Sequence, residues 1–338
     1  MRMRKLYLTW MFITLAATAA KADNIQVVHL EENDSLGALL LKQDVPDSLV
    51  ITGLMKVQDF RDLRLYCLKN RNVTGLNLHD VEISNNQLPD SALSFGYAYT
   101  PLIGLRYVAL PGQITSIGKN AMLRLVHLQH VEMPETVTDI QHHAFSGCSS
   151  LQEIVLPPNL KTIGSTAFAG CNALQEVKLP EGLTRIEKEA FYETGIQEIY
   201  IPESVNYIGT AAFYFSQLRE VTLPAALRQL PENAFNECAN LERITCLSPQ
   251  PPAILPDNDQ ANWLSQTVVW VPKGAGEAYR LAEGWCKCKS IEEKDLTNIS
   301  RVHAGENSDS QSCYRIDGMR VNAPRRGLYI KGRRLILR

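Results

Sequence analysis

Apolar and polar positions repeat every 22 or 23 residues through the middle of the chain. The copy from Leu151 to Phe168 reads L-x-x-I-x-L-P-x-x-L-x-x-I-x-x-x-A-F. A proline and an alanine column keep this step over six copies, and all but the first alanine are followed by phenylalanine. The columns are Pro111, Pro134, Pro157, Pro180, Pro202 and Pro224, and Ala121, Ala144, Ala167, Ala190, Ala212 and Ala234. Two columns with one period define an internal repeat.

Each copy predicts one turn of a coil. Alternation along the strand points Val177 and Leu179 inward with Leu174, and Glu176 and Lys178 outward. Proline ends the strand because it cannot donate to a sheet ladder. One copy buries too few side chains to offset its backbone entropy, so only a stack of copies folds. The period is typical of leucine-rich repeats, and the predicted fold class is an α/β-type repeat solenoid of short strands with short helical or irregular return segments, capped at both ends.

Weaker traces of the pattern flank the repeats, which comprise six full copies and a partial seventh over residues 105–246. Residues 23–104 predict an N-terminal cap. Its elements are a strand over 48–53, a helix from Asp59 to Leu68 with Asp59 as N-cap, a strand over 73–78 and a polar loop over 84–99.

After the repeats, residues 247–295 predict a C-terminal cap. It contains a strand over 267–271 and a helix over 276–282, and Trp285 and Ile291 close the core. Residues 296–313 are polar and predict a linker. Residues 314–338 predict a β-type tail of three short strand-like pieces, basic because it has eight Arg or Lys against one Asp.

The first 22 residues predict a signal peptide. Arg2, Arg4 and Lys5 precede an apolar run, and Ala20-Lys21-Ala22 offers small residues to a signal peptidase. The run is too short to span a membrane, and no later stretch is apolar enough for a transmembrane segment. We expect an exported protein, located at the cell surface, in the outer envelope or outside the cell. Between signal peptide and tail the chain is acidic, which argues against a nucleic acid partner.

Candidate chemistry is sparse. The sequence has no G-x-S-x-G, H-E-x-x-H, P-loop or G-x-G-x-x-G motif. His127, His130 and the pair His142 and His143 fall at outward repeat positions, where solvated side chains are expected. We therefore predict no enzyme activity, no catalytic or metal-ligating residue and no cofactor.

The eight cysteines of the chain invite a disulfide framework, which their spacing does not favour. Cys148, Cys171 and Cys238 share one repeat column, and adjacent rungs seldom offer disulfide geometry. They predict a buried structural column. Cys286 and Cys288 would suit a redox or metal pair, but nothing near them completes a zinc site.

Outward strand positions form two surface columns. They are Tyr107, His130, Glu153, Glu176, Glu198, Glu220 and Arg243, and Ala109, Glu132, Val155, Lys178, Tyr200, Thr222 and Thr245. Adjacent strands lie about 4.8 Å apart, so the four glutamates predict an acidic stripe. One interpretation is a solvated face, on which Lys178 and the column of Gln152, Gln175 and Gln197 reduce the repulsion between the glutamates. The other is a site for a basic peptide or a divalent cation, and its candidate partner-binding residues are Glu153, Glu176, Lys178, Glu198, Tyr200 and Glu220.

The repeat, together with Val271-Pro-Lys-Gly274, Ala278-Tyr279 and Gly284-Trp285, resembles the BspA-like leucine-rich repeat family of surface proteins of Bacteroides-type bacteria. The resemblance covers most of residues 45–292. It departs at Met122, which replaces the usual phenylalanine, and at Cys288, where an aromatic residue commonly follows the tryptophan. It implies export and adhesion or protein binding without catalysis. The last 25 residues are similar to C-terminal tails of exported Bacteroides-type proteins, including sorting domains of type IX secretion, but are shorter.

Three functional hypotheses follow. The preferred one is a monomeric binding protein whose partner is a protein or glycan on a host or neighbouring cell. The second is an enzyme or accessory domain with a site in the non-repeat ends, which a deep cleft with paired acids in residues 23–104 would favour. The third is a purely structural envelope protein, which would bind no partner in extracts.

Overall fold

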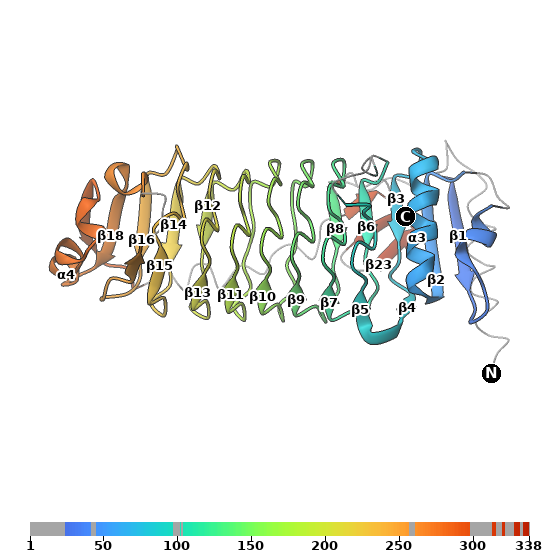
Figure 1. Ribbon diagram of the computed structural model, residues 1–338, viewed down its shortest axis with the longest axis horizontal. Helices are drawn as coiled ribbons and strands as arrows, with labels where there is room; N and C mark the ends of the chain where they lie inside the picture. Colours follow the sequence, from blue (N-terminus) through green and yellow to red (C-terminus); the bar gives the residue numbers. More distant parts are fainter. Residues whose placement is uncertain are drawn as a thin grey trace.

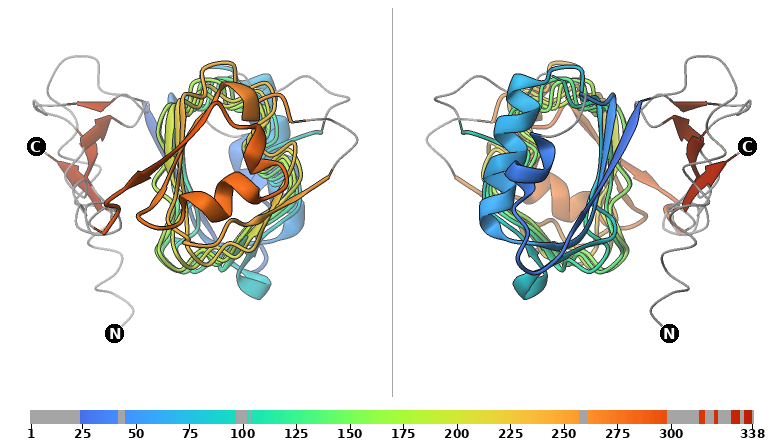
Figure 2. Two further views of the ribbon diagram at one scale, coloured as in Figure 1. Left: turned by 90° about the vertical axis from the view of Figure 1, so that its left-hand side faces the viewer. Right: turned by 90° about the vertical axis from the view of Figure 1, so that its right-hand side faces the viewer.

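The chain winds into a stack of coils, as the repeat predicts. The computed structural model describes residues 24–41, 45–96, 102, 104–256 and 261–297, and four short strands between 313 and 337. Successive coils lie side by side along the long axis (Figure 1), and seen along that axis they superpose as a closed outline (Figure 2). The predicted signal peptide and most of the predicted linker lie outside the described residues.

The strands of the first side of the coil form two parallel sheets, ordered β1-β2-β3-β6-β8 and β12-β14-β16-β18-β19, with β4 also paired to β2. Their bounds are β1 Ile25–Leu30, β2 Ser48–Met55, β3 Gly75–Asn77, β4 Val81–Ile83, β6 Tyr107–Ala109, β8 His130–Glu132, β12 Glu198–Tyr200, β14 Glu220–Leu223, β16 Arg243–Cys246, β18 Val268–Pro272 and β19 Ser290–Lys294.

The second side carries shorter parallel strands, in a sheet ordered β13-β11-β10-β9-β7-β5 and a separate pair, β15-β17. Their bounds are β5 Gln87–Leu88, β7 Ser116–Ile117, β9 Asp139–Ile140, β10 Thr162–Ile163, β11 Arg185–Ile186, β13 Tyr207–Ile208, β15 Gln229–Pro231 and β17 Ala253–Leu255. Turns that contain the Ala-Phe pairs form the third side. Helical segments are few among the described residues and comprise α2 Leu36–Leu40, η1 Ser84–Asn86, α3 Val57–Lys69, η2 Leu264–Gln266, α4 Gly276–Leu281 and η3 Trp285–Lys287.

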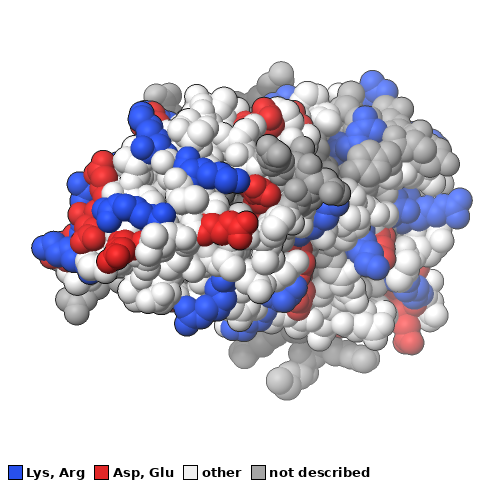
Figure 3. Space-filling model, turned by 60° about the vertical axis from the view of Figure 1, so that its left-hand side comes forward, with Lys and Arg blue, Asp and Glu red and all other residues white. Residues whose placement is uncertain are grey.

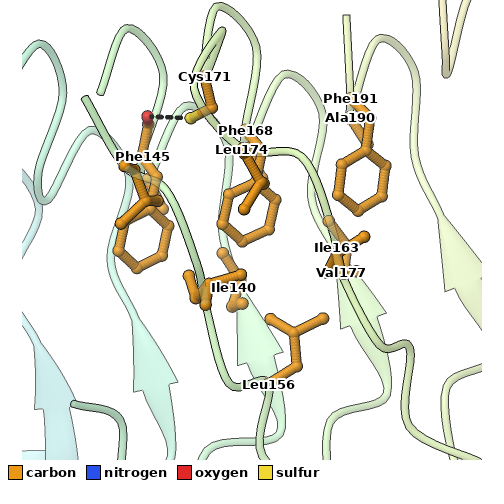
Figure 4. Packing of buried hydrophobic residues seen from close by; sticks show 14 of the residues in the cluster. Ile140, Phe145, Leu156, Ile163, Phe168, Cys171, Leu174, Val177, Ala190 and Phe191 are labelled. Carbon is orange, nitrogen blue, oxygen red and sulfur yellow. Dashed lines mark hydrogen bonds between the residues drawn. The ribbon is translucent and has the colours of Figure 1, made fainter. Parts of the chain in front are cut away.

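A ladder of phenylalanine rings fills the interior of the stack. Phe145, Phe168, Phe191, Phe213 and Phe235 are fully buried. Adjacent centroids are 5.1 to 5.5 Å apart, and the rings are close to parallel. Figure 4 shows three of these rings side by side above Ile140 and Ile163 of the second side. The phenylalanine of each Ala-Phe pair therefore fills the interior of its coil.

The N-terminal coils use the helix α3 where later coils use turns (Figure 1). The predicted helix is confirmed, but it begins at Val57, and Asp59 lies in its first turn rather than at the N-cap. Asp59 nevertheless stabilises the N-terminus of α3. Its carboxylate is buried and accepts hydrogen bonds from the Lys56 and Leu36 amides at 2.8 and 3.1 Å. One side chain therefore fixes the start of α3 and joins it to α2.

The predicted polar loop over 84–99 is wrong over its described part. Gln87 and Leu88 form β5, which pairs with β7, and Leu88, Ala92 and Leu93 are fully buried. This segment is an atypical coil of the solenoid. The segment is mostly polar, so its few core-facing apolar positions could not be recognised from the sequence pattern.

The strand and the helix predicted after the repeats are both present. The strand β18 and helix α4 lie at the end of the stack, where Trp285 is fully buried and its Nε1 donates to the Pro252 carbonyl at 2.8 Å. Ile291 is only half-buried. In the tail, the strands β20 Cys313–Arg315, β21 Arg320–Val321, β22 Leu328–Lys331 and β23 Arg334–Leu337 form an antiparallel sheet ordered β21-β20-β22-β23, so the first predicted piece is two strands. No helix in the described residues has the length and apolar character needed to span a membrane.

The predicted cysteine column is confirmed as buried and structural. Cys148, Cys171 and Cys238 are free thiols that donate to carbonyls of the preceding coil, at 3.2, 3.3 and 3.1 Å. Removal from water disfavours the thiolate and raises the pKa of Cys148 to about 12 and that of Cys238 to about 11.

These thiols are expected to resist alkylation while the protein is folded. Iodoacetamide at pH 8 should modify Cys286, which is exposed, and leave Cys148, Cys171 and Cys238 unmodified, because they are inaccessible and protonated. Peptide mass spectrometry measures this. In urea all four should react at similar rates. Modification of Cys171 as fast as Cys286 in the native protein would show that the column is not closed.

Candidate functional site

The outward columns on the first side of the coil are the candidate recognition surface, and the structure places their members differently from coil to coil. Glu176, Lys178 and Glu198 are exposed, while Glu153, Tyr200 and Glu220 are half-buried. All six lie outside the apolar interior, as alternation predicts.

The acidic stripe is not one continuous sheet. The predicted strands around Glu153 and Glu176 are not formed, and these two glutamates lie on extended segments between β8 and β12. The two sheets of the first side end on either side of this gap. Only Glu198 and Glu220 are direct partners, in the parallel register of β12 and β14. The expected spacing of about 4.8 Å therefore applies to this pair alone.

The C-terminal end of the stripe is neutralised by a cation–aromatic group that the sequence interpretation missed. Arg243, the register neighbour of Glu220, forms an ion pair with it and places its guanidinium 4.1 Å from the centre of the Trp270 ring. Lys294 lies 5.2 Å from the same ring and 3.0 Å from Glu292. The alternation of buried Val269 and Val271 could have placed Trp270 on this face, in the column of Tyr200.

At the other end of the stripe, the prediction of a solvated His130 is wrong. His130 is 7% exposed, and its ring stacks on Tyr107 with centroids 5.8 Å apart. The Tyr107 hydroxyl donates to Glu132 at 2.7 Å. Burial lowers the pKa of His130 to about 4, although Glu153, 3.9 Å away, opposes the shift. His130 is thus neutral at pH 7 and does not cancel the charge of Glu153.

The net negative charge of the stripe is therefore concentrated in its middle. No ion pair of Glu176 or Glu198 occurs within the described ranges of the chain. Lys178 is the cation of the same surface. Figure 3 shows acidic and basic side chains interspersed on the face that it presents, so that face does not carry charge of one sign. Nowhere in the described residues do three His, Cys, Asp or Glu side chains gather as a metal-binding group, so the divalent-cation alternative has no ligand set there.

Tyr200 is positioned as the aromatic residue of this surface. It follows Glu198 on β12 with one inward residue between them, and it faces Thr222 of β14. Burial raises its pKa, and the charges of Glu181 and Glu203 raise it further. Its hydroxyl therefore stays protonated and can donate a hydrogen bond at any physiological pH.

A second surface feature, on the third side of the coil, was also missed. Tyr192 and Tyr214 stack with centroids 5.8 Å apart, and Phe215 packs edge-on against both, at 6.1 and 5.0 Å. We call Tyr192, Tyr214 and Phe215 the aromatic cluster. The sequence does indicate this cluster, because two successive copies read A-F-Y and A-F-Y-F. Each copy needs only one aromatic ring for the core, so the additional rings are available to the surface.

Phe215 has an unfavourable backbone conformation. Its φ is 59°, in the left-handed region, and the corresponding positions of two earlier coils are Gly147 and Gly170, with φ of 72° and 73°. This conformation costs a residue with a side chain about 1 to 2 kcal/mol. The ring is nonetheless 45% exposed and adds little to the core, where Phe213 already fills the interior.

The coil geometry and repeated core define a leucine-rich repeat solenoid protein. Residues 78–172 and 140–250 match the BspA type leucine rich repeat region, in six copies, and together they span more than half of the chain. The chain belongs to this family, and the resemblance seen in the sequence is confirmed.

Solved structures to which the chain is similar include a leucine-rich repeat protein from Bacteroides ovatus, with 22% identity and a TM-score of 0.37 over 56% of this chain and 64% of that one. The chain thus covers less than two thirds of that protein. A leucine rich repeat protein of T. pallidum has 19% identity and a TM-score of 0.36 over 84% of this chain and 90% of its own. A leucine rich cell surface protein from Faecalibacterium prausnitzii has 19% identity and a TM-score of 0.34, over 64% and 84%. No curated protein matches the chain.

Proposed function

We propose that this chain is an exported, non-catalytic binding protein that recognises a basic segment of a partner protein through the middle of its acidic stripe. The observation that carries the proposal is the group of Glu176, Glu198 and Tyr200 on the outside of the stack, in which both carboxylates are exposed and form no ion pair with neighbouring coils among the described residues. Export rests on the predicted signal peptide and on membership of the BspA type family.

Rigidity supports recognition by this surface. Ile199 and Val221, the inward neighbours of the stripe residues, are at most 4% exposed, so the backbone beneath Glu198, Tyr200 and Glu220 is anchored in the core. A backbone that is already ordered loses little conformational freedom on binding, which favours affinity.

The charge pattern selects the partner's chemistry. Glu198 and Glu220 lie directly opposite each other, an arrangement that costs stability for like charges, and only Glu220 has Arg243 beside it. A lysine or arginine of a partner, placed between Glu176 and Glu198, would offset the charge of Glu198, which has no such neighbour, and could stack on Tyr200. Lys178 would pair with an acidic residue at the edge of the same segment.

Neutralising the stripe is expected to weaken binding. Replacing Glu153, Glu176, Glu198 and Glu220 by glutamine keeps their shape and removes four charges. On an array of lysine- and arginine-bearing peptides with uncharged counterparts, the chain without its signal peptide should prefer basic peptides at 0.1 M salt. The quadruple variant should bind them about tenfold or more weakly. Binding by the unaltered chain should fall at 1 M salt, where the Debye length shrinks from about 10 Å to about 3 Å.

The matched control makes the same charge change elsewhere. Glu31, Glu82, Glu277 and Glu283 are exposed near the two ends of the solenoid, and their replacement by glutamine should leave peptide binding unchanged. Equal loss in both quadruple variants would indicate an effect of net charge alone. Unchanged affinity and salt dependence in the stripe variant would refute the proposal.

A further inference from the structure

The aromatic cluster lies on the third side of the coil, apart from the acidic stripe. Backbone hydrogen bonds between adjacent turns fix its place. The Glu193 amide donates to the Tyr214 carbonyl at 2.8 Å, and the Phe215 amide donates to the Asn236 carbonyl at 3.0 Å. Glu193, Phe215 and Glu237 therefore follow one another at the tips of three successive turns, and all three have a positive φ.

The exposed ring of Phe215 is not needed to build the turn that carries it. Phe215 is 45% exposed in the left-handed region, a conformation that Arg124, Glu193 and Glu237 also adopt at the same turn position of other coils. The same turn is built with Gly147 and Gly170 in earlier coils. The ring is thus presented to solvent at a position where glycine would satisfy the backbone.

A fixed polar pair follows in the next two turns of the stack. The Asn262 amide nitrogen donates to Glu237 Oε1 at 2.7 Å, and the Glu237 backbone amide donates to Asn262 Oδ1 at 3.2 Å. Both side chains are exposed. The pair holds a carboxylate acceptor and an amide donor in the turns that follow the aromatic cluster, where they can receive a ligand with several hydroxyl groups.

We propose that the aromatic cluster, with Glu237 and Asn262 at its rim, binds a neutral sugar ring of a glycan. The weakly positive C–H edges of a pyranose are attracted to the negative face of an aromatic ring. Its hydroxyl groups donate to the Glu237 carboxylate and accept from the Asn262 amide. Three rings and two polar side chains match one sugar, whereas a stable protein interface requires about 800 Å² on each partner.

The charge around the cluster narrows the ligand class. Glu193 and Glu237 flank Phe215 in its column, and both are exposed. Their charges oppose uronic acids, sialic acids and sulfated sugars, so the site selects neutral hexoses or pentoses. This site lies on another side of the coil from the stripe, and its ligand is independent of the basic peptide proposed above.

Affinity electrophoresis tests the site. The chain without its signal peptide is run in native gels that contain mannan, dextran, galactan or arabinoxylan, and in a gel that contains the acidic polygalacturonate. We expect retardation by at least one neutral polysaccharide and none by polygalacturonate. Phe215→Gly should raise the dissociation constant at least tenfold. Because glycine suits this backbone, the variant should melt at the same temperature as the parent chain or higher.

Two further variants separate the cluster from general surface effects. Glu237→Gln keeps the shape of the rim and should weaken retardation severalfold. Tyr207→Ala removes another exposed ring, which stacks under Arg185 on the second side, and should have no effect. The proposal is overturned if no neutral polysaccharide retards the chain, if only polygalacturonate does, or if Phe215→Gly binds as the parent does.

Discussion

Replacing Phe168 by alanine is expected to lower the free energy of unfolding by about 3 to 5 kcal/mol, the range for large aromatic truncations in a closed core. The ring has no exposed surface and is stacked between Phe145 and Phe191, with centroids at 5.1 and 5.5 Å. Neither neighbour can close the gap without leaving its own stack. Urea unfolding followed by circular dichroism measures the loss.

Because coils contact mainly their neighbours, the damage should be local. Hydrogen exchange should rise most in the coils of Phe145 and Phe191, and least near α3. Val155→Ala is the control, since Val155 is 67% exposed and should change stability by less than about 0.5 kcal/mol. A loss below about 1 kcal/mol for Phe168→Ala would mean that the rings do not form the core.

Replacing Gly53 by alanine is expected to cost about 2 to 5 kcal/mol, from backbone strain together with a steric clash. Gly53 lies in β2 with φ of 87°, and a Cβ atom there would be 2.1 Å from the carbonyl oxygen of Leu30, its register partner in β1. The clash is with backbone, so β1 would have to move away from the sheet. Thermal and urea unfolding measure the cost.

Gly274 separates the clash from the strain. Its φ is 83°, and a Cβ atom there would meet nothing within 4 Å, so Gly274→Ala should cost only the conformational part, about 1 to 2 kcal/mol. Equal losses in the two variants would show that the contact between β1 and β2 does not constrain the N-terminal end of the stack.

Much of the fold could be predicted because every coil buries the same columns. The apolar positions of the copy around Leu174 and the Ala-Phe pair identified the interior. The closing role of Trp285 followed from the open end of the stack, whereas Ile291, expected to share that role, is only half-buried. The segment around Leu88 was mistaken for a loop because its coil departs from the repeat. Asp59 was assigned to the N-cap because an acidic residue favours either position of a first helical turn.

The surface was less predictable than the core. Alternation gives the direction of a side chain but not its neighbours, so it placed Glu198 and Tyr200 outward and could not show that Arg243 neutralises Glu220. It also placed His130 outward without showing that its ring is buried against Tyr107. The strain at Phe215 depends on a backbone angle, which no residue pattern states directly.

The column of Cys148, Cys171 and Cys238 and the phenylalanine ladder connect each coil to the next. We expect these contacts to hold the spacing of the outward residues that the proposed recognition uses. A buried thiol in one coil donates to a carbonyl of the coil before it, so core contacts and backbone register reinforce each other. Substitutions in the core are therefore expected to weaken binding through the spacing of the stripe, even where they are far from Glu198.

Hydrogen exchange with a bound peptide tests the central claim most directly. The chain without its signal peptide is exchanged alone and with the basic peptide that it binds most tightly on the array, at 0.1 M salt. We expect slower exchange in residues 174–179, 198–200 and 220–223, the middle of the stripe and its neighbours, and no change in the second-side strands. Protection confined to the second side, to the tail or to the coil ends would contradict the assignment of the stripe as the recognition surface.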